Sequence, residues 1–349
     1  MSVEQAGNSD RTVLVTGGSG FLAGHAIVQL LKQGYPVRTS IRNLAKEPDL
    51  RAALTAGIDR PVEFEFVQAD LASDDGWNEA AAGCHYVLHI ASPFPASQPK
   101  DAQELIVPAR DGALRVVRAG LDAGVDRIVM TSSVAAVRGD GGPMRDTPYT
   151  EEDWTDPDLP GISPYAQSKT IAERSAWEMV DESGDRDRLS VINPSLILGP
   201  VIGDESSTSL GVIERMLNGM PAVPRLAFGY VDVRDVAAMH IAAMTSDAAG
   251  GERFIASGPS LWMSETAEIL REALPVEAAK SPKRTAPKPL VRVIALFDPG
   301  IRGFLNDIGR KVKLSSEKAE RLLGWEARPV EETIVECAQS LVEREKRSA

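Results

Sequence analysis

Tyr165 and Lys169 stand four residues apart in the segment "SPYAQSK" (163–169). On a helix, this spacing places both side chains on one face. A free tyrosine has a pKa of about 10, and a nearby lysine cation brings that pKa toward neutrality, where acid–base chemistry is efficient. The pair therefore predicts proton transfer to or from a bound molecule. The alternative is a tyrosine and a lysine on the exposed side of a helix, and the surrounding residues decide between the two.

Two serines precede this pair at the end of a predicted strand. The segment "RIVMTSS" (127–133) is largely apolar until it reaches Ser132 and Ser133. Open α/β sheets bind their ligands outside the carboxyl ends of their strands, and a serine hydroxyl there can stabilise charge that develops on a substrate oxygen. Both serines are candidates for this role.

Glycines follow the first predicted strand and open the first predicted helix, in "VTGGSGFLAGH" (15–25). Gly17 and Gly20 permit a tight turn, and the helix N-terminus adds free N–H donors and the positive end of its dipole. Ala23 takes the third glycine place of the usual fingerprint, where it can serve the same close packing. A turn without a ligand is the alternative. The predicted dinucleotide contacts here are Gly17, Gly18, Ser19, Gly20, Phe21 and Leu22.

The second predicted strand indicates which dinucleotide is bound. A site for NAD usually has an Asp or Glu at the end of this strand, on the ribose 2′-hydroxyl. The segment "VRTSIRNLAKEP" (37–48) has no acid before Glu47 and offers Arg42 and Lys46 instead. Two cations suit a 2′-phosphate. We therefore predict NADP(H), and two solvated cations are the alternative.

The elements that must position these groups alternate between strand and helix in the first half of the chain. This alternation predicts a parallel sheet with helices on both faces. Asp70 and Leu71 end the third strand and are predicted to lie beside the adenine, with a helix cap at Asp70 as the alternative. The predicted strands are 12–17, 35–42, 62–70, 85–92 and 127–133, and the predicted helices are 21–34, 101–124 and 164–183.

The second half of the chain is less regular. Residues 138–163 are rich in Gly, Pro and Asp, and a loop of this length is usually functional. Residues 281–290 predict a proline-rich surface link. Strands are predicted within 189–200 and 253–258, a strand end and a helix within 229–246, and two helices near the C-terminus. We expect an NADP-binding domain over 1–200, to which 229–258 returns, and a substrate-binding part over 201–228 and 259–349.

The composition limits the classes of partner. The chain has 349 residues, 43% hydrophobic and 25% charged, with a net charge of −12 and a pI near 5.0. This acidity disfavours nucleic acid and anionic membranes as partners. The start of the chain does not resemble a signal peptide, and no apolar run reaches the length of about 18 residues that a membrane span needs, so we expect a cytoplasmic protein. The two cysteines and four histidines do not form a metal-site pattern, and we interpret the histidines as structural.

The motifs "TGGSGF", "ADL", "TSS", "YAQSK" and "NPSLILGP" occur in this order. As a set they resemble the extended short-chain dehydrogenase/reductase family, within the NAD-dependent epimerase/dehydratase superfamily. The segments "GFLAGH", "IRNLAK", "HIASPF", "TSSVAAV", "EEDW" and "SKTIAERSAWE" are similar to its dihydroflavonol reductase and methylglyoxal or carbonyl reductase branch. The resemblance covers nearly the whole chain and ends with "LLGWEARPVEE".

This resemblance implies a fold and a reaction. The fold is a Rossmann doubly wound parallel sheet with a smaller C-terminal α/β part that binds substrate. The reaction is the reduction of an aldehyde or ketone to an alcohol by hydride transfer from NADPH, with Tyr165 as proton donor. Lys169 would also bond the nicotinamide ribose, and Ser133, directly before "VAAV", matches the catalytic serine better than Ser132 does. The further cofactor contacts that the resemblance implies are Ala91, Ser92, Pro93, Pro194, Ile197 and Ser209.

The resemblance places the substrate between the cofactor sheet and the C-terminal part. Candidate walls are Phe94, Val134, Ile202 and residues 205–213, and plain core packing is the alternative for each. Phe94 and Val134 suggest an apolar or aromatic carbonyl compound. Monomer and homodimer both stay open.

Three other functions compete with carbonyl reduction. A nucleotide-sugar epimerase or dehydratase usually keeps NAD bound, which Arg42 and the missing acid oppose, and a dehydratase would want an acid near Ser133. A hydroxysteroid-type dehydrogenase would run the same chemistry in the oxidative direction. A dinucleotide-sensing regulator could share the fold without the Tyr165 and Lys169 pair, because fold does not determine function.

Overall fold

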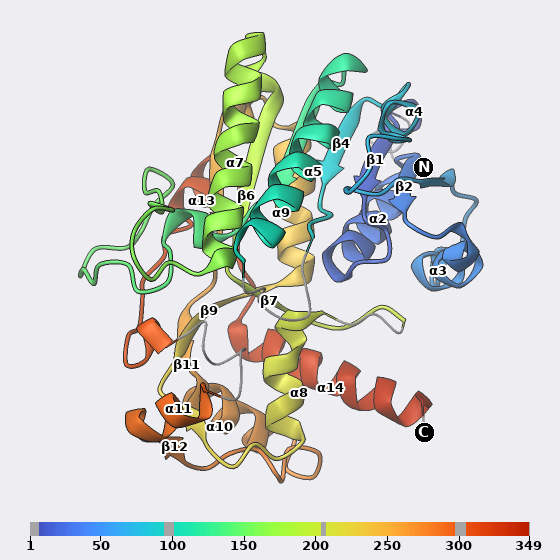
Figure 1. Cartoon of the computed structure of the whole chain (residues 1–349). Coiled ribbons are helices and arrows are strands. Elements are labelled where there is room, and N and C mark those ends of the chain that lie inside the picture. The colour runs from blue at the N-terminus through green and yellow to red at the C-terminus, as the bar shows by residue number, and fades with distance from the viewer. Residues whose placement is uncertain (1–6, 94–100, 204–206, 297–304, 349) are drawn as a thin grey trace.

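The computed structural model describes residues 7–93, 101–203, 207–296 and 305–348. Phe94 and residues 205–206, which belong to the predicted substrate wall, lie outside the described residues. A large sheet with helices on both faces forms one part of the chain, and a smaller lobe lies below it in Figure 1.

The large sheet is parallel throughout and has the order β10-β6-β5-β4-β1-β2-β3. From β1 the chain adds strands first on one side and then on the other, so the order reverses between β1 and β4. Such a switch point is where doubly wound sheets bind ligands. The strands are β1 (Val13–Thr16), β2 (Val37–Ile41), β3 (Phe64–Gln68), β4 (Tyr86–His89), β5 (Arg127–Thr131), β6 (Leu189–Pro194) and β10 (Arg253–Ala256).

Each face of this sheet has its own hydrophobic core. In β1, Val13 and Val15 belong to the cluster that includes helices α2 (Phe21–Gln33) and α9 (Val233–Thr245), whereas Leu14 belongs to the cluster of the opposite face. Successive side chains of a strand point to opposite faces, so a strand covered on both sides is apolar at every position. The opposite face is covered by α4 (Trp77–Ala81), α5 (Gln103–Asp122) and α7 (Pro164–Ser183), and α5 and α7 lie side by side in Figure 1.

The smaller lobe contains two small sheets and several helices. One sheet has the order β11-β9-β7 and the other pairs β12 with β8. The strands are β7 (Leu196–Leu198), β8 (Val223–Pro224), β9 (Ala227–Asp232), β11 (Ser260–Trp262) and β12 (Thr285–Ala286). Within the described residues, the remaining α-helices are α3 (Glu47–Thr55), α6 (Val134–Val137), α8 (Gly211–Leu217), α10 (Met263–Ala273), α11 (Lys288–Ile294), α13 (Glu317–Leu323) and α14 (Val330–Ser348).

The predicted Rossmann architecture is confirmed, and one local prediction is incomplete. Residues 281–290 are not only a surface link: Ser281 is buried, β12 pairs with β8, and α11 begins at Lys288. Proline is accepted in the first turn of a helix, where its missing N–H would be unpaired in any case, and this explains the start of α11. Among the described residues, no helix combines the length and the apolar run that a membrane span requires.

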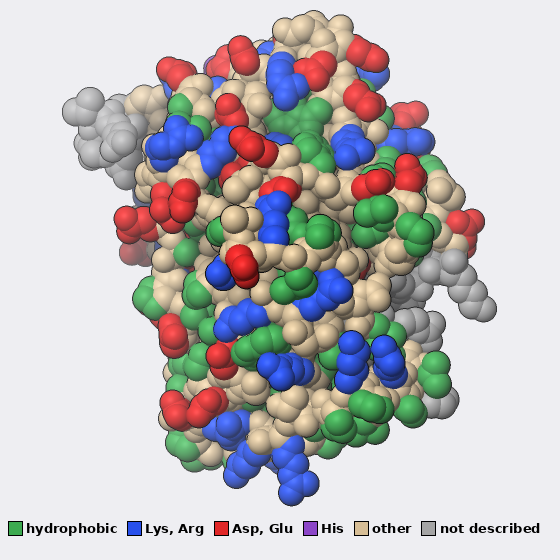
Figure 2. All heavy atoms as spheres, turned by 90° about the vertical axis from the view of Figure 1, so that its left-hand side faces the viewer, with side chains coloured by type: hydrophobic (Ala, Val, Ile, Leu, Met, Phe, Trp, Pro, Cys, Tyr) green, Lys and Arg blue, Asp and Glu red, His purple; other side chains and the backbone are tan. Residues whose placement is uncertain are grey.

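Charge is unevenly distributed over the surface. Residues 278–296 contain five exposed cations and no acidic residue, although the whole chain carries a net charge of −12. Figure 2 shows Lys and Arg side chains gathered toward the lower end of one face, at the level where Figure 1 places α11 and β12. The five cations are Lys280, Lys283, Arg284, Lys288 and Arg292, and none has an ion pair with a described residue.

Three buried histidines make the stability of the fold sensitive to acid. His25, His89 and His240 are at most 7% exposed, and burial lowers their pKa values to about 4, about 3 and about 4. The unfolded chain binds protons at these positions below its ordinary histidine pKa of about 6.5, before the folded chain does. We therefore expect the free energy of unfolding to decrease as the pH falls from about 6.5 toward 4.

Urea unfolding midpoints measured on either side of this pH would test the expectation. Nε2 of His240 contacts Oγ1 of Thr131 (2.7 Å) and its Nδ1 contacts the carbonyl of Val236 (2.8 Å). The variant His240→Gln should start from a lower stability but lose less of it on acidification. An identical pH dependence in the two proteins would contradict the assignment of this proton to His240.

Candidate active site

The turn after β1 requires glycine at two positions. Gly17 has a φ of 74°, in the left-handed region, and a Cβ atom built on it would lie 2.9 Å from the Cβ of Ala91. A Cβ atom on Gly18 would lie 2.2 Å from Oγ1 of Thr39. The N–H of Gly20 donates to the carbonyl of Gly17 (2.8 Å) and closes the turn. Side chains at these positions would displace β2 or the segment after β4, so the glycines are what allows the close approach of backbone segments here.

Helix α2 begins directly at this turn with free N–H groups. Its N-cap residue, Gly20, has extended backbone and no side chain that could accept a hydrogen bond. The first N–H groups of a helix lack partners inside it, so this end fits a pyrophosphate. Ala23 is 1% exposed and supplies the predicted close packing. Ser19 is exposed, whereas the side chains of Phe21 and Leu22 are buried, so the latter two could contact a ligand mainly through their backbone.

The two predicted cations follow β2 and are exposed to solvent. Arg42 and Lys46 are exposed, and neither has an ion pair with any described residue. Arg38, earlier in β2, is instead bonded to Glu65 (Nε to Oε2, 2.6 Å). Two unpaired cations next to the glycine turn fit a dinucleotide that carries a 2′-phosphate.

Asp70 and Leu71 follow the end of β3. Oδ1 of Asp70 accepts the N–H of Ala72 (3.0 Å), so the carboxylate caps a turn and not a helix; the next helix, α4, begins at Trp77. The side chain of Leu71 packs against the cluster of buried residues under α5. These contacts are structural, and a contact of either residue with an adenine stays a prediction.

A threonine that the sequence analysis missed connects the turn to the end of β4. Oγ1 of Thr16 accepts the N–H groups of Ile90 (3.0 Å) and Ala91 (2.9 Å) and lies 3.0 Å from Nδ1 of His89. With two N–H donors on this oxygen, its own hydrogen is directed to Nδ1, so His89 accepts. The segment 91–93 is thereby held beside the glycine turn. A polar residue at the end of the first strand and a histidine within the fourth were the signals available in the sequence.

Tyr165 lies in the first turn of α7 and faces Ser133. Ser163 caps this helix through the N–H of Ala166 (3.2 Å), and Pro164 follows it. The side chains of Tyr165 and Ser133 are hydrogen-bonded. Ser133 is itself the N-cap of α6, where its Oγ accepts the N–H of Ala135 (3.1 Å). The helix caps therefore position both hydroxyl groups.

The two serines have different surroundings. Ser132 is 3% exposed, and its Oγ donates to Oε2 of Glu173 (2.6 Å), away from Tyr165. Ser133 is the serine that the structure brings to the tyrosine. This arrangement favours Ser133 as the residue that would contact a carbonyl oxygen.

The Lys169 ammonium is buried at the end of β4. The residue is 8% exposed, and its Nζ donates to Oγ of Ser92 (3.0 Å). Burial lowers the pKa of Lys169 to about 8, and the charge of Glu173 opposes this shift. Burial raises the pKa of Tyr165, with the Ser133 hydrogen bond acting in the opposite direction, so the expected approach of this pKa to neutrality is not seen.

The other predicted cofactor contacts come from β6, β7 and the segment that follows β7. Pro194 ends β6, Ile197 lies in β7, and Ser209 lies in a short 3-10 helix that packs on β7. Val134 packs with the buried residues Val137, Tyr149 and Ile255, and Ile202 lines a cavity of about 510 Å³ between α2 and α9. The structure thus gives Val134 a packing role and places Ile202 at this cavity.

Comparison with known proteins agrees with this geometry. The family model "NAD dependent epimerase/dehydratase family" matches residues 13–256. A cinnamoyl-CoA reductase of Medicago truncatula is 33% identical over 351 residues, covering 99% of this chain and 98% of that protein. The NADPH-dependent methylglyoxal reductase of Saccharomyces cerevisiae is 30% identical and covers 96% of this chain and 99% of its own.

Solved structures show the same similarity. The yeast methylglyoxal/isovaleraldehyde reductase complexed with NADPH matches with a TM-score of 0.78 and 28% identity over 96% of this chain and 99% of that chain. Vestitone reductase from alfalfa matches with a TM-score of 0.74 and 26% identity over 96% and 99%. The predicted resemblance to the extended short-chain reductases is confirmed. The chain belongs to the NAD-dependent epimerase/dehydratase family.

Proposed function

We propose that this protein is an NADPH-dependent carbonyl reductase that converts an aldehyde or ketone to an alcohol. The observation that carries the proposal is the hydrogen-bonded pair of Tyr165 and Ser133, with Lys169 one helical turn further on, beyond the carboxyl ends of β4 and β5. Relatives over nearly the whole chain are named as reductases, and one of them as NADPH-dependent. We place 1–200 and 229–258 around the cofactor, and the remaining residues around the substrate, in a cytoplasmic monomer or homodimer.

NADPH, when bound, would supply the hydride. The glycine turn and the start of α2 would hold its pyrophosphate, and Arg42 and Lys46 its 2′-phosphate. Ser133 and Tyr165 would donate hydrogen bonds to the carbonyl oxygen and stabilise the charge that develops on it. Burial raises the pKa of Tyr165, so its proton is present at neutral pH for transfer to that oxygen. Lys169 would bond the ribose through its ammonium and stabilise the phenolate that remains.

The test is consumption of the reduced nicotinamide, followed by its absorbance, with a panel of aldehydes and ketones. NADPH should be consumed, and NADH should be a much poorer cofactor. If no carbonyl compound is reduced although NADP(H) binds, the sensing regulator becomes the better hypothesis. Interconversion of nucleotide sugars without net cofactor consumption would instead favour an epimerase.

An acyl-CoA thioester is a second candidate substrate. Several relatives are named as cinnamoyl-CoA reductases. The five exposed cations of residues 280–292 give the smaller lobe a surface that suits the phosphates of such a molecule. Thioesters therefore belong in the substrate panel. Release of the free thiol together with NADPH consumption would identify this activity, and activity on free aldehydes alone would exclude it.

The pH dependence of the reaction follows from the buried lysine. The pKa of Lys169 is lowered to about 8, so its ammonium is present below this pH and is lost above it. We expect kcat for reduction to decrease as the pH rises through about 8. A pH profile of kcat measured at saturating NADPH and substrate checks this, and a rate that is constant well beyond that pH would show that the charge of Lys169 is not needed.

A further inference from the structure

Glu173 is a buried carboxylate one helical turn beyond Lys169. Its side chain has no exposure to solvent, and it lies on the same face of α7 as Lys169 and Tyr165 because the three positions are spaced by four. A buried carboxylate is costly unless its oxygens are fully hydrogen-bonded and its charge is compensated. The hydrogen-bond donors and the cation around Glu173 therefore indicate its role.

Both carboxylate oxygens have two donors. Oε2 accepts Oγ of Ser132 (2.6 Å) and Nδ2 of Asn193 (2.8 Å). Oε1 accepts Nε of Arg253 (2.5 Å) and Nε1 of Trp177 (3.4 Å). Apart from Trp177, the donors come from just beyond β5, from β6 and from β10. One side chain thus connects α7 to three neighbouring strands: just beyond the end of β5, near the end of β6 and at the first residue of β10.

These contacts reach the catalytic serine from two sides. Ser132 is bonded to Glu173 directly, and Nδ2 of Asn193 is shared between Glu173 and the carbonyl of Ser133 (3.1 Å). The backbone of the two serines is therefore held against the helix that carries Tyr165. A shift of Glu173 would change the distance and angle between the hydroxyl groups of Ser133 and Tyr165.

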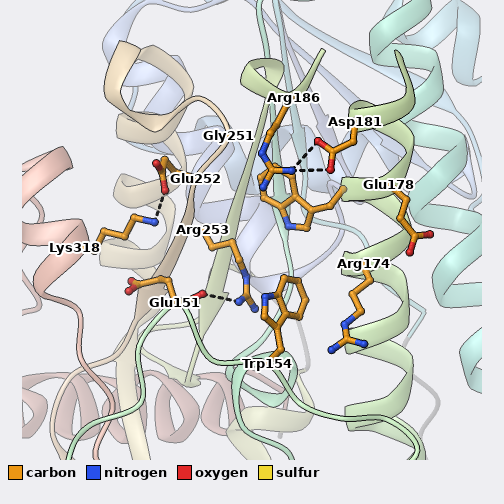
Figure 3. Close-up of a pocket in the computed structure, with 11 residues that line it drawn as sticks. Glu151, Trp154, Arg174, Glu178, Asp181, Arg186, Gly251, Glu252, Arg253 and Lys318 are labelled. Carbon is orange, nitrogen blue, oxygen red and sulfur yellow. Dashed lines mark hydrogen bonds and ion pairs between the residues drawn. The ribbon is translucent and has the colours of Figure 1, made fainter. Parts of the chain in front are cut away.

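Arg253, the cation partner of Glu173, is held from its other side by the loop before α7. Its Nη1 donates to the carbonyls of Glu151 (2.8 Å) and Asp153 (3.0 Å), and its guanidinium lies 3.5 Å from the ring centre of Trp154. Figure 3 shows Arg253 against Trp154 and bonded to Glu151, in the wall of a cavity of about 380 Å³. The segment "EEDW" thus fixes the arginine that compensates the buried carboxylate.

Glu173 also supplies the charge that opposes the effect of burial on Lys169. His89 of β4 also faces Lys169; its pKa is lowered to about 3 by burial and by this lysine, so it is neutral. Asp140 faces Tyr165, and Arg253 faces Glu173. Glu173 is therefore the anion of this set that favours the ammonium form of Lys169.

We propose that Glu173 is a positioning residue of the reductase: it aligns Ser133 with Tyr165 and keeps Lys169 in its charged form without touching the substrate. The expected effect of Glu173 on turnover rests on the proposed function, because it presupposes carbonyl reduction. Glu173 is also expected to affect the protonation of Lys169, and this effect can be measured without turnover.

The test uses the full chain and the variant Glu173→Gln, which keeps the size of the side chain and removes its charge. We expect kcat to fall about 10- to 100-fold, as for a small misplacement of reacting groups. The decrease of kcat at high pH should also begin at a lower pH than in the wild type. The dissociation constant for NADPH should change little, because Glu173 does not lie in the glycine turn.

Ser132→Ala is the matched control. It removes one hydrogen bond to the carboxylate and leaves the charge, so kcat should decrease while the high-pH limb stays in place. If Glu173→Gln does not fold, the double variant Glu173→Gln/Arg253→Met removes both members of the buried pair, a change that proteins often tolerate. The high-pH limb should again begin at a lower pH.

The pH dependence of acetylation of Lys169, read by peptide mass spectrometry, reports its protonation without cofactor or turnover. In the variants without the Glu173 charge, the midpoint should lie at a lower pH than in the wild type. An unchanged midpoint together with an unchanged kcat profile would overturn the inference, even if Tyr165→Phe is inactive as proposed. If the wild type reduces no carbonyl compound, the proposed function fails, and the labelling midpoint still decides whether Glu173 controls the charge of Lys169.

Discussion

Replacing Tyr165 by phenylalanine is expected to reduce kcat for carbonyl reduction by about 10²- to 10⁴-fold, the usual contribution of a positioned general acid. The substitution removes the phenolic oxygen that is hydrogen-bonded to Ser133 and leaves the ring that packs in the first turn of α7. Binding of NADPH should be nearly unchanged, because the glycine turn and the cations Arg42 and Lys46 are not altered. Initial rates and a fluorescence titration with NADPH would measure the two quantities.

Tyr86→Phe provides the control for this experiment. Tyr86 begins β4, and its hydroxyl accepts a hydrogen bond from Arg11 (3.2 Å), apart from the group formed by Ser133 and Lys169. The Tyr86→Phe variant should be slightly less stable than the wild type and should keep its activity. If Tyr165→Phe were as active as this control, the proton would have to come from another group or from water, and the mechanism proposed for Tyr165 would be wrong.

Replacing both Arg42 and Lys46 by alanine is expected to raise the KM for NADPH by about 10- to 100-fold while leaving the KM for NADH nearly unchanged. A hydrogen bond to a charged partner contributes about 1.5–3 kcal/mol. Loss of one such bond already corresponds to about a 10- to 100-fold rise in KM, so the expected range holds even if only one of the two cations contacts the phosphate. Both side chains are exposed and have no ion pair with a described residue, so their removal should not destabilise the fold. Steady-state kinetics with each cofactor would measure the effect.

The double variant Lys288→Ala/Arg292→Ala is the control for this experiment, because it also removes two positive charges. These cations are also exposed, but they lie on α11 in the smaller lobe. Their loss should leave the ratio of the two KM values unchanged. An equal effect of both pairs on NADPH would indicate a general influence of net charge, and no effect of either pair would place the 2′-phosphate elsewhere.

The local patterns of the chain were sufficient to predict most of the cofactor half. The spacing of Tyr165 and Lys169 implies one face of a helix, and α7 confirms that helix over Pro164–Ser183. The glycines after β1 and the lack of an acid before Glu47 are likewise properties of short segments. Such features can be read from sequence because helical periodicity, strand alternation and turn chemistry depend on residues that are neighbours along the chain.

The pairing of β12 with β8 and the burial of Ser281 could not be predicted in the same way. Residues 281–290 have the composition of a link, yet they become ordered because residues more than 50 positions earlier in the chain supply a partner strand. Composition carries no information about such a partner. This is why β12 and the start of α11 were missed in the proline-rich segment, whereas the long helix with an internal proline, α5, was predicted correctly.

The sequence by itself was sufficient to predict the parallel doubly wound sheet, the glycine turn and the position of Tyr165 and Lys169 on one face of a helix. The motif resemblance favoured Ser133 over Ser132, but only the tertiary structure shows their different surroundings, with Glu173 beside Ser132 and Tyr165 beside Ser133. The same holds for the burial of Lys169, which lowers its pKa, and for the contact of Thr16 with the segment after β4. These properties depend on which strand ends lie side by side, and strand order is set by packing over the whole sheet, which no single segment encodes.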